Sequence, residues 1–243
     1  MLASNVRPPV VALLGGEGLR SDSASLWQHM LRDFEPPRVA IISAALSAVP
    51  APHAERRVMI TKAVLEEMGM QTQLIEPADQ SSDALTDVPI VYLPGGEALA
   101  VCEHLRESVI WQAIQAPNSP VRMLIASGGS AVALGQVAFG PIKPVPAQLE
   151  ELSFDILPSL GLLKGVVILP YFSWLQDQVI HKIVSLSDGY ILVGIDDQAA
   201  LISRSHGWEV AGLGTVSIIR SGMSTAAFDS GAVIPTDVLP SYS

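Results

Sequence analysis

Short apolar runs alternate with longer amphipathic segments along the first three quarters of the chain. The runs predicted as strands are residues 9–14, 39–44, 71–75, 89–93, 121–126 and 166–169. Such lengths suit strands of a sheet, and several of these runs lack the alternation expected of a half-exposed strand. The segments predicted as helices include 21–34, 53–68 and 176–186, where apolar residues recur at helical spacing or capping residues mark the ends. This order predicts an α/β fold with a mostly parallel central sheet and helices on both faces.

The pattern changes after residue 190. Four short β-like runs, YILVGI, AALIS, WEVAG and TVSII, follow one another at short intervals. The connections between them are Asp196-Asp197, Ser205-His206-Gly207 and the glycines at 212 and 214, which are typical turn residues. We therefore predict C-terminal β-hairpins. The proline-rich stretch 139–158 is interpreted as an excursion, so residues 1–243 are expected to form a single domain.

Composition and charge argue against a nucleic-acid-binding protein and against a membrane protein. The 243 residues are 49% hydrophobic, enough for a sizeable core, and 24 acidic against 14 basic residues give a net charge of −10. There is no basic run, so nucleic acid is not an expected partner. No apolar run approaches the roughly 20 residues of a membrane helix, and the first residues lack a signal-peptide pattern. With one cysteine, Cys102, and no internal disulfide, we expect a cytoplasmic protein that does not associate with membranes.

Two glycine-rich turns that follow predicted strands are candidates for a site, whereas the one at residues 15–18 is interpreted as a tight strand-to-loop turn. Residues 124–135, LIASGGSAVALG, indicate a strand, a sharp turn and a helix. A serine at such a turn is expected to be exposed at the carboxyl edge of the sheet, beside backbone N–H groups that can stabilise an oxyanion. The second turn, Pro94-Gly95-Gly96-Glu97, is expected at the same edge.

Four segments in this order resemble the serine peptidase family of cyanophycinase and dipeptidase E. They are YLPGGEALAVCEHLR (92–106), IASGGSAVALG (125–135), LGLLKGVVILPYFSW (160–174) and VGIDDQAALISRSHGWEVAGLGTV (193–216). The resemblance implies a fold like that of class I glutamine amidotransferases. It also implies hydrolysis of a peptide or isopeptide bond next to an aspartyl residue, through an acyl-serine intermediate.

The resemblance assigns roles to residues around the first turn. It places Ser127 at the nucleophile and the N–H groups of Gly96 and Gly128 at the oxyanion hole, with Gly129 as the elbow glycine. Ser127 is preferred to Ser130 because Gly129 then follows the serine by two residues, as in the family. These glycines and Glu97 are expected to line the ligand site.

The sequence departs from the family pattern at the general base. Where the family has a histidine, this chain has Tyr171; the usual glycine before the elbow is Ile125, and residues 142–145 carry no carboxylate where an acid is expected. A phenol with a pKa near 10 is a proton donor at neutral pH and cannot replace imidazole. We predict a catalytically degenerate homologue that keeps a pocket for a small peptide-like or carboxylate ligand. Neither a cofactor nor a metal is expected.

Two alternatives are left open. A working serine hydrolase could take its base from His53, from Lys143 or from a carboxylate in 150–155, whereas His104, His181 and His206 are expected at the solvated surface. A homodimer with a structural or interaction role could use the C-terminal stretch 226–239 and the aromatic segment 171–174.

Overall fold

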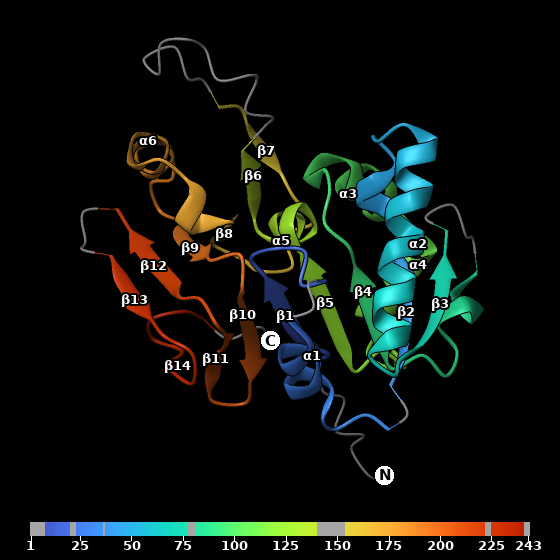
Figure 1. Cartoon of the computed structure of the whole chain (residues 1–243). Helices are drawn as coiled ribbons and strands as arrows, with labels where there is room; N and C mark the ends of the chain where they lie inside the picture. The colour runs from blue at the N-terminus through green and yellow to red at the C-terminus, as the bar shows by residue number, and fades with distance from the viewer. Residues whose placement is uncertain are drawn as a thin grey trace, which may run out of the picture.

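The computed structural model describes residues 8–19, 23–35, 37–76, 81–139, 154–221 and 225–240. Within these ranges, an eight-stranded sheet forms the centre of the molecule (Figure 1). Its strands, in spatial order, are β14 (Val233–Ile234), β11 (Gly207–Gly212), β10 (Ala199–Arg204), β1 (Val10–Leu14), β5 (Met123–Ser127), β4 (Ile90–Leu93), β2 (Arg38–Ile42) and β3 (Gln71–Ile75). Strands β1, β5, β4, β2 and β3 are parallel, and β10, β11 and β14 continue the sheet in antiparallel pairing. The predicted α/β fold with a mostly parallel sheet is confirmed.

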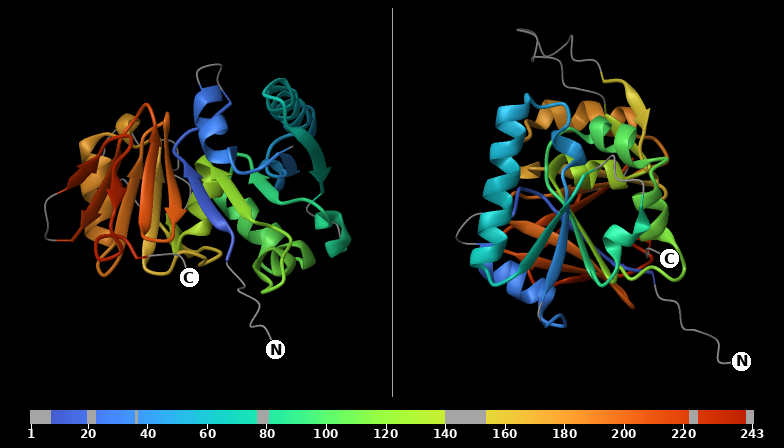
Figure 2. Two further views of the ribbon diagram at one scale, coloured as in Figure 1. Left: turned by 90° about the horizontal axis from the view of Figure 1, so that it is seen from below. Right: turned by 90° about the vertical axis from the view of Figure 1, so that its right-hand side faces the viewer.

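Helices cover both faces of this sheet (Figure 2, right). The helices are α1 (Ala24–Leu31), α2 (Ala51–Glu67), α3 (Ala98–Leu105), α4 (Val109–Gln115), α5 (Gly128–Leu134) and α6 (Asp177–Leu186). Trp27 of α1 and Leu65 of α2 pack against one face together with Tyr92. Val101 of α3 and Leu134 of α5 pack against the other face. Successive strand residues therefore enter different cores, as period-two alternation requires.

A second, four-stranded sheet lies beside the first. It contains, in order, β13 (Ala226–Phe228), β12 (Val216–Arg220), β9 (Ile191–Ile195) and β8 (Val166–Pro170). Val193 of β9 faces the main core, and Leu192 packs with Ile183 of α6 on the other side. The short elements are β6 (Val137–Phe139), β7 (Ile156–Pro158) and the 3₁₀ turns η2 (Ala44–Leu46), η3 (Ser82–Leu85) and η5 (Phe172–Trp174).

The C-terminal strands pair differently from the predicted series of hairpins. A hairpin does join β10 and β11 at Ser205-His206. However, β9 pairs with β8 and β12 in the second sheet, whereas β10 pairs with β1 in the first. The turn at Asp196-Asp197 therefore connects two sheets. In it, the Asp196 carboxylate accepts hydrogen bonds from the N–H groups of Ser173 and Thr215, 3.1 and 3.0 Å away. The hairpin predicted at this turn is wrong.

Candidate functional site

Three adjacent parallel strands deliver glycine pairs to one edge of the large sheet. Gly15-Gly16 follow β1, Gly95-Gly96 follow β4 after one proline, and Gly128-Gly129 follow β5, which lies between the other two strands. The carboxyl ends of parallel strands are where open α/β sheets bind ligands. We therefore take this edge as the candidate site.

Ser127 lies at this edge but does not face the solvent. Its exposed fraction is 0%, and its backbone is extended, with φ −118° and ψ 149°. Because Ser127 is still the last residue of β5, its side chain follows the strand alternation and lies on the same face as Ile125, towards Tyr92. The expectation that a turn would expose this hydroxyl is wrong.

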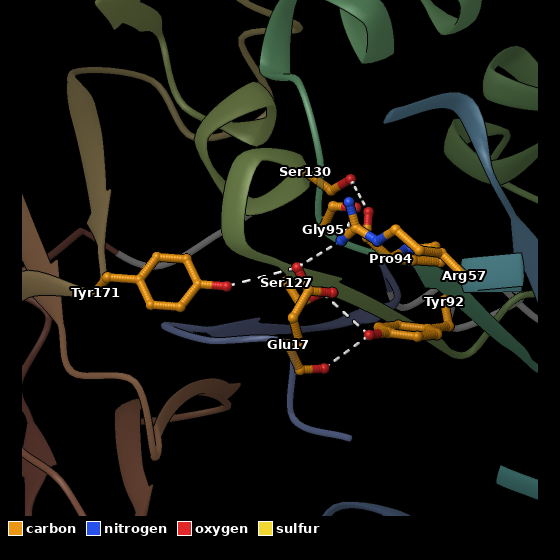
Figure 3. Close-up of polar contacts among 8 residues, drawn as sticks. All are labelled: Glu17, Arg57, Tyr92, Pro94, Gly95, Ser127, Ser130 and Tyr171. Atoms are coloured by element: carbon orange, nitrogen blue, oxygen red, sulfur yellow. Dashed lines mark hydrogen bonds and ion pairs between the residues drawn. The ribbon is translucent and has the colours of Figure 1, made fainter. Parts of the chain in front are cut away.

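The hydrogen bonds of Ser127 determine the direction of its proton (Figure 3). The Tyr92 hydroxyl donates to the carbonyl of Glu17 at 2.9 Å, so its single proton is already used. The Ser127 hydroxyl, 3.0 Å from the same phenol oxygen, must then be the donor in that contact. Its proton is therefore directed at a neutral phenol, away from any base.

Gly128 occupies the sharp bend between strand and helix. Its φ of +50° is the left-handed conformation that a nucleophile elbow imposes on the residue it projects into the cleft. A Cβ atom at this position would lie 3.6 Å from the Cα of Gly95 and 3.6 Å from both Cε2 and the hydroxyl of Tyr171. The side chain that this bend could present to Tyr171 is absent.

The other glycines predicted for the site have structural contacts. A Cβ on Gly129 would lie 1.9 Å from the carbonyl oxygen of Gly96, so the bend and the start of α3 touch through their backbones. Ser130 strengthens this contact, because its hydroxyl donates to the carbonyl of Pro94. Glu97 is exposed at the N-cap of α3. The structure thus brings Gly96, Gly128 and Gly129 together, with Glu97 directed to the solvent.

Tyr171 faces the bend from a left-handed conformation of its own. It lies between β8 and η5 with φ 52° and ψ 37°, and its N–H donates to the carbonyl of Gly15 at 3.0 Å. Burial, followed by the nearby carboxylate of Glu17, raises the pKa of Tyr171 to about 12. Tyr171 is therefore a protonated hydrogen-bond donor throughout the neutral range. The ring also packs on Trp174, whose exposed fraction is 68%.

A carboxylate and a guanidinium that sequence reasoning missed complete the site. Glu17 accepts a hydrogen bond from Arg57 of α2 at 2.9 Å and lies 3.5 Å from the Tyr171 hydroxyl (Figure 3). A Cβ on Gly95 would lie 2.5 Å from the Glu17 carboxylate, so only glycine permits this approach. Glu17 follows a Gly-Gly pair at the end of a strand, a signal that could have marked it; Arg57 carries no such signal.

In the described parts of the chain, none of the alternative bases is hydrogen-bonded to Ser127, whose side-chain partner is Tyr92. His53 lies in the first turn of α2 and is exposed, as are His104, His181 and His206. Lys143, Glu150 and Glu151 lie outside the described residues. Across the described ranges, no cluster of His, Cys, Asp or Glu could hold a metal, and no helix has the length and hydropathy needed to cross a membrane.

The buried Tyr92 phenol is expected to lower the stability of the fold at alkaline pH. Burial raises its pKa well above the usual value, so the phenol stays protonated in the fold at a pH where the unfolded chain has lost that proton. The folded state then binds more protons, and stability falls as the pH rises above about 10, by about 1.4 kcal/mol per unit. At neutral pH we expect Tyr92→Phe to cost about 1–2 kcal/mol, because it removes two hydrogen bonds.

We therefore expect the difference in unfolding free energy between wild type and Tyr92→Phe to shrink above about pH 10 and to reverse near about pH 11. Urea unfolding of both proteins between about pH 8 and pH 11.5 measures this difference. Ser127→Ala is the control, because it removes one partner, keeps the phenol and should keep the alkaline slope. A difference independent of pH would contradict the assignment.

Comparison with known proteins supports the fold. The structure resembles the crystal structure of a peptidase from an acI-B1 Actinobacterium, with a TM-score of 0.76 and 18% identity, over 93% of this chain and 96% of that one. It also resembles a putative peptidase E protein from Listeria monocytogenes EGD-e, with a TM-score of 0.63 and 16% identity, over 85% of this chain and 99% of that one. At these identities the likeness shows a shared fold. No curated protein shows significant sequence similarity to the chain.

A family model is more specific than these structural likenesses. The model of peptidase family S51 matches residues 13–210, which include the strand ends of β1, β4 and β5 as well as Tyr171. The match covers most of the chain. This chain therefore belongs to peptidase family S51.

Proposed function

We propose that this protein is a catalytically degenerate member of peptidase family S51 that binds a small peptide-like or carboxylate ligand without cleaving it. The observation that carries the proposal is the residue at the elbow: the bend that projects a side chain towards position 171 is made by Gly128, which has none. Ser127, one residue earlier, points into the protein instead.

The acid–base groups support the same conclusion. A serine nucleophile needs a positioned base near its proton, and the Ser127 proton is directed at the Tyr92 phenol. Tyr171, with a pKa of about 12, holds its own proton. Loss of a single triad member typically lowers the rate by about 10⁴ or more. Loss of both the projected nucleophile and the base leaves no route to an acyl-serine.

The features that bind a ligand are retained. The amino end of α5 and the backbone at Gly95-Gly96 meet at the carboxyl edge of the sheet. With Gly128 at the elbow, the backbone N–H of Gly129 takes the oxyanion position that follows the nucleophile. Arg57 adds a cation, and Tyr171 adds a neutral donor. Such groups favour an anionic or carbonyl-containing ligand.

Labelling with a fluorophosphonate tests the proposal. We expect Ser127 to stay unlabelled in the wild type between about pH 6 and pH 9, with Ser127→Ala giving the background, because the Ser127 hydroxyl contacts a phenol and not a base. An active serine peptidase serves as the positive control, and peptide mapping by mass spectrometry locates any adduct. Labelling of Ser127 at a rate like that of the control would overturn the proposal.

A further inference from the structure

We propose that the cavity between α2 and the ends of β1 and β4 binds a free α-amino acid with an apolar side chain, its carboxylate on Arg57 and its ammonium group on Glu17. The inference rests on the proposed function, since it names the ligand of a site that does not cleave. It is carried by the pairing of one cation and one anion on the wall of an otherwise largely apolar cavity.

The cavity has the size and lining for a small amphipathic ligand. Its volume is about 250 Å³, below the ~300–1,000 Å³ usual for drug-sized ligands. The lining residues are Glu17, Leu19, Leu46, Arg57, Ile60, Thr61 and Pro94. Apart from the ion pair and one threonine, these side chains are aliphatic or proline. A ligand that fills the cavity should therefore have a charged end and a short hydrocarbon end.

The ion pair can open to admit such a ligand. The side chains of Arg57 and Glu17 are 40% and 37% exposed, and the pair joins them through a single contact of 2.9 Å. Exposed pairs of this kind contribute little to stability, so separating the two groups costs little. Arg57 also lies 3.4 Å from the carbonyl of Gly95, which places its guanidinium at the edge of the glycine turn.

Charge balance selects the class of ligand. A simple carboxylate that took Arg57 would leave Glu17 without its cation and next to a second negative charge. An amine that took Glu17 would leave Arg57 unpaired in the same way. A zwitterion replaces one internal pair with two pairs to the ligand and leaves neither charge uncompensated. The two wall charges therefore favour an α-amino acid over either of its singly charged analogues.

Tyr171 stays beside the anion during this exchange, with its hydroxyl 3.5 Å from the carboxylate. Its hydroxyl lies on the side of Glu17 away from Arg57, and it remains a donor to the carboxylate when Arg57 turns to the ligand (Figure 3). The Glu17 carboxylate also lies directly on the Cα of Gly95, which limits its movement. We therefore expect Arg57 to turn towards the ligand while Glu17 keeps its contact with Tyr171.

Isothermal titration calorimetry with three probes of one shape tests the inference. The probes are L-leucine, 4-methylpentanoate, which lacks the ammonium group, and 3-methylbutylamine, which lacks the carboxylate. We expect wild-type protein to bind L-leucine at least about tenfold more tightly than either analogue. Absence of L-leucine binding at ~10 mM, or equal binding of all three probes, would overturn the inference.

Three variants sharpen the test. Arg57→Gln should weaken L-leucine binding by about tenfold or more, because a charged hydrogen bond to the carboxylate is lost. Glu17→Gln keeps the shape of the side chain but removes its charge, so the preference for L-leucine over 4-methylpentanoate should fall by a similar factor. Lys62→Gln is the matched control on the same helix, since Lys62 pairs with Glu66 outside the cavity, and it should bind as wild type does.

The two proposals can fail separately. If a fluorophosphonate labels Ser127 while L-leucine binds as expected, the proposed lack of catalysis is wrong and the amino-acid site stands. If Ser127 stays unlabelled and Glu17→Gln leaves the ligand preference unchanged, the proposed function stands and the assignment of the ammonium group to Glu17 is wrong.

Discussion

A Gly128→Ser, Tyr171→His double variant is expected to become reactive towards a fluorophosphonate at residue 128, about 10²-fold above either single variant. The bend at Gly128 already has the backbone conformation of an elbow, with φ +50°. A Cβ there meets its neighbours at 3.6 Å, which is ordinary van der Waals contact, and two of these neighbours are atoms of the Tyr171 side chain. The introduced hydroxyl therefore faces the position where an imidazole would supply the base.

The substitution at position 171 should also suit the backbone. Among residues other than glycine, histidine is enriched in the left-handed conformation, which costs a bulky aromatic residue more. Rates of adduct formation and the labelled peptide are measured by mass spectrometry for the double variant and both single variants. Adding Ser127→Ala to the double variant should leave the rate unchanged. A folded double variant that stays unlabelled, or an adduct on Ser127, would contradict the assignment of the elbow to Gly128.

Gly129→Ala is expected to lower the free energy of unfolding by about 3 kcal/mol, at the upper end of typical overpacking costs. Its Cβ would lie 1.9 Å from the carbonyl oxygen of Gly96 and 3.1 Å from the backbone nitrogen of Ala98. Both atoms belong to the backbone, so no side-chain rotation can relieve the clash. The start of α3 and the start of α5 would have to separate.

Gly128→Ala provides a matched comparison one residue earlier. Its Cβ has room, but its positive φ costs an alanine about 1–2 kcal/mol. We therefore expect Gly129→Ala to be the more destabilising change, although its own φ lies outside the strained region. Denaturant unfolding of the two variants and wild type decides the order. A Gly129→Ala protein within about 1 kcal/mol of wild type would contradict the close packing described here.

The fold was predictable because its parallel strands are short and strongly apolar. The runs at 9–14 and 121–126 predict β1 and β5 to within a few residues, since a strand buried on both faces needs no polar positions. The C-terminal pairing was not predictable in the same way. β9 and β10 are separated by turn residues typical of a hairpin, and only long-range pairing with β12 and β1 sends them to different sheets.

The sequence predicts at which edge of the sheet the site lies, but not which residue occupies the elbow. Glycine turns after two strands correctly predict that Gly96, Gly128 and Gly129 meet at one edge. The one-residue difference between Ser127 and Gly128 depends on where β5 ends, and strand ends are weakly encoded. Whether a hydroxyl faces the cleft or the core changes with that single residue, because side chains alternate along a strand.

Other features of the site depend on contacts across the fold. Glu17 and Arg57 are 40 residues apart, and Tyr92 contacts Ser127 across 35 residues, so no local pattern predicts that these pairs meet. The homodimer, the cytoplasmic location and the roles of Lys143, Glu150 and Glu151 remain predictions.

The three glycine pairs at the ends of β1, β4 and β5 have a consequence for how this site can be altered. These glycines, which we call the rim, present backbone without side chains at the sheet edge. A Cβ on Gly15, Gly16, Gly95, Gly96 or Gly129 would lie within about 2.5 Å of another atom. Substitution of Gly15, Gly16, Gly96 or Gly129 would displace the backbone, and substitution of Gly95 would displace the Glu17 carboxylate. Selectivity is therefore better adjusted at the side chains of Glu17, Arg57 and Tyr171, which lie next to these glycines. Libraries that vary these three positions and leave the rim untouched offer the most direct route to new ligands on this scaffold.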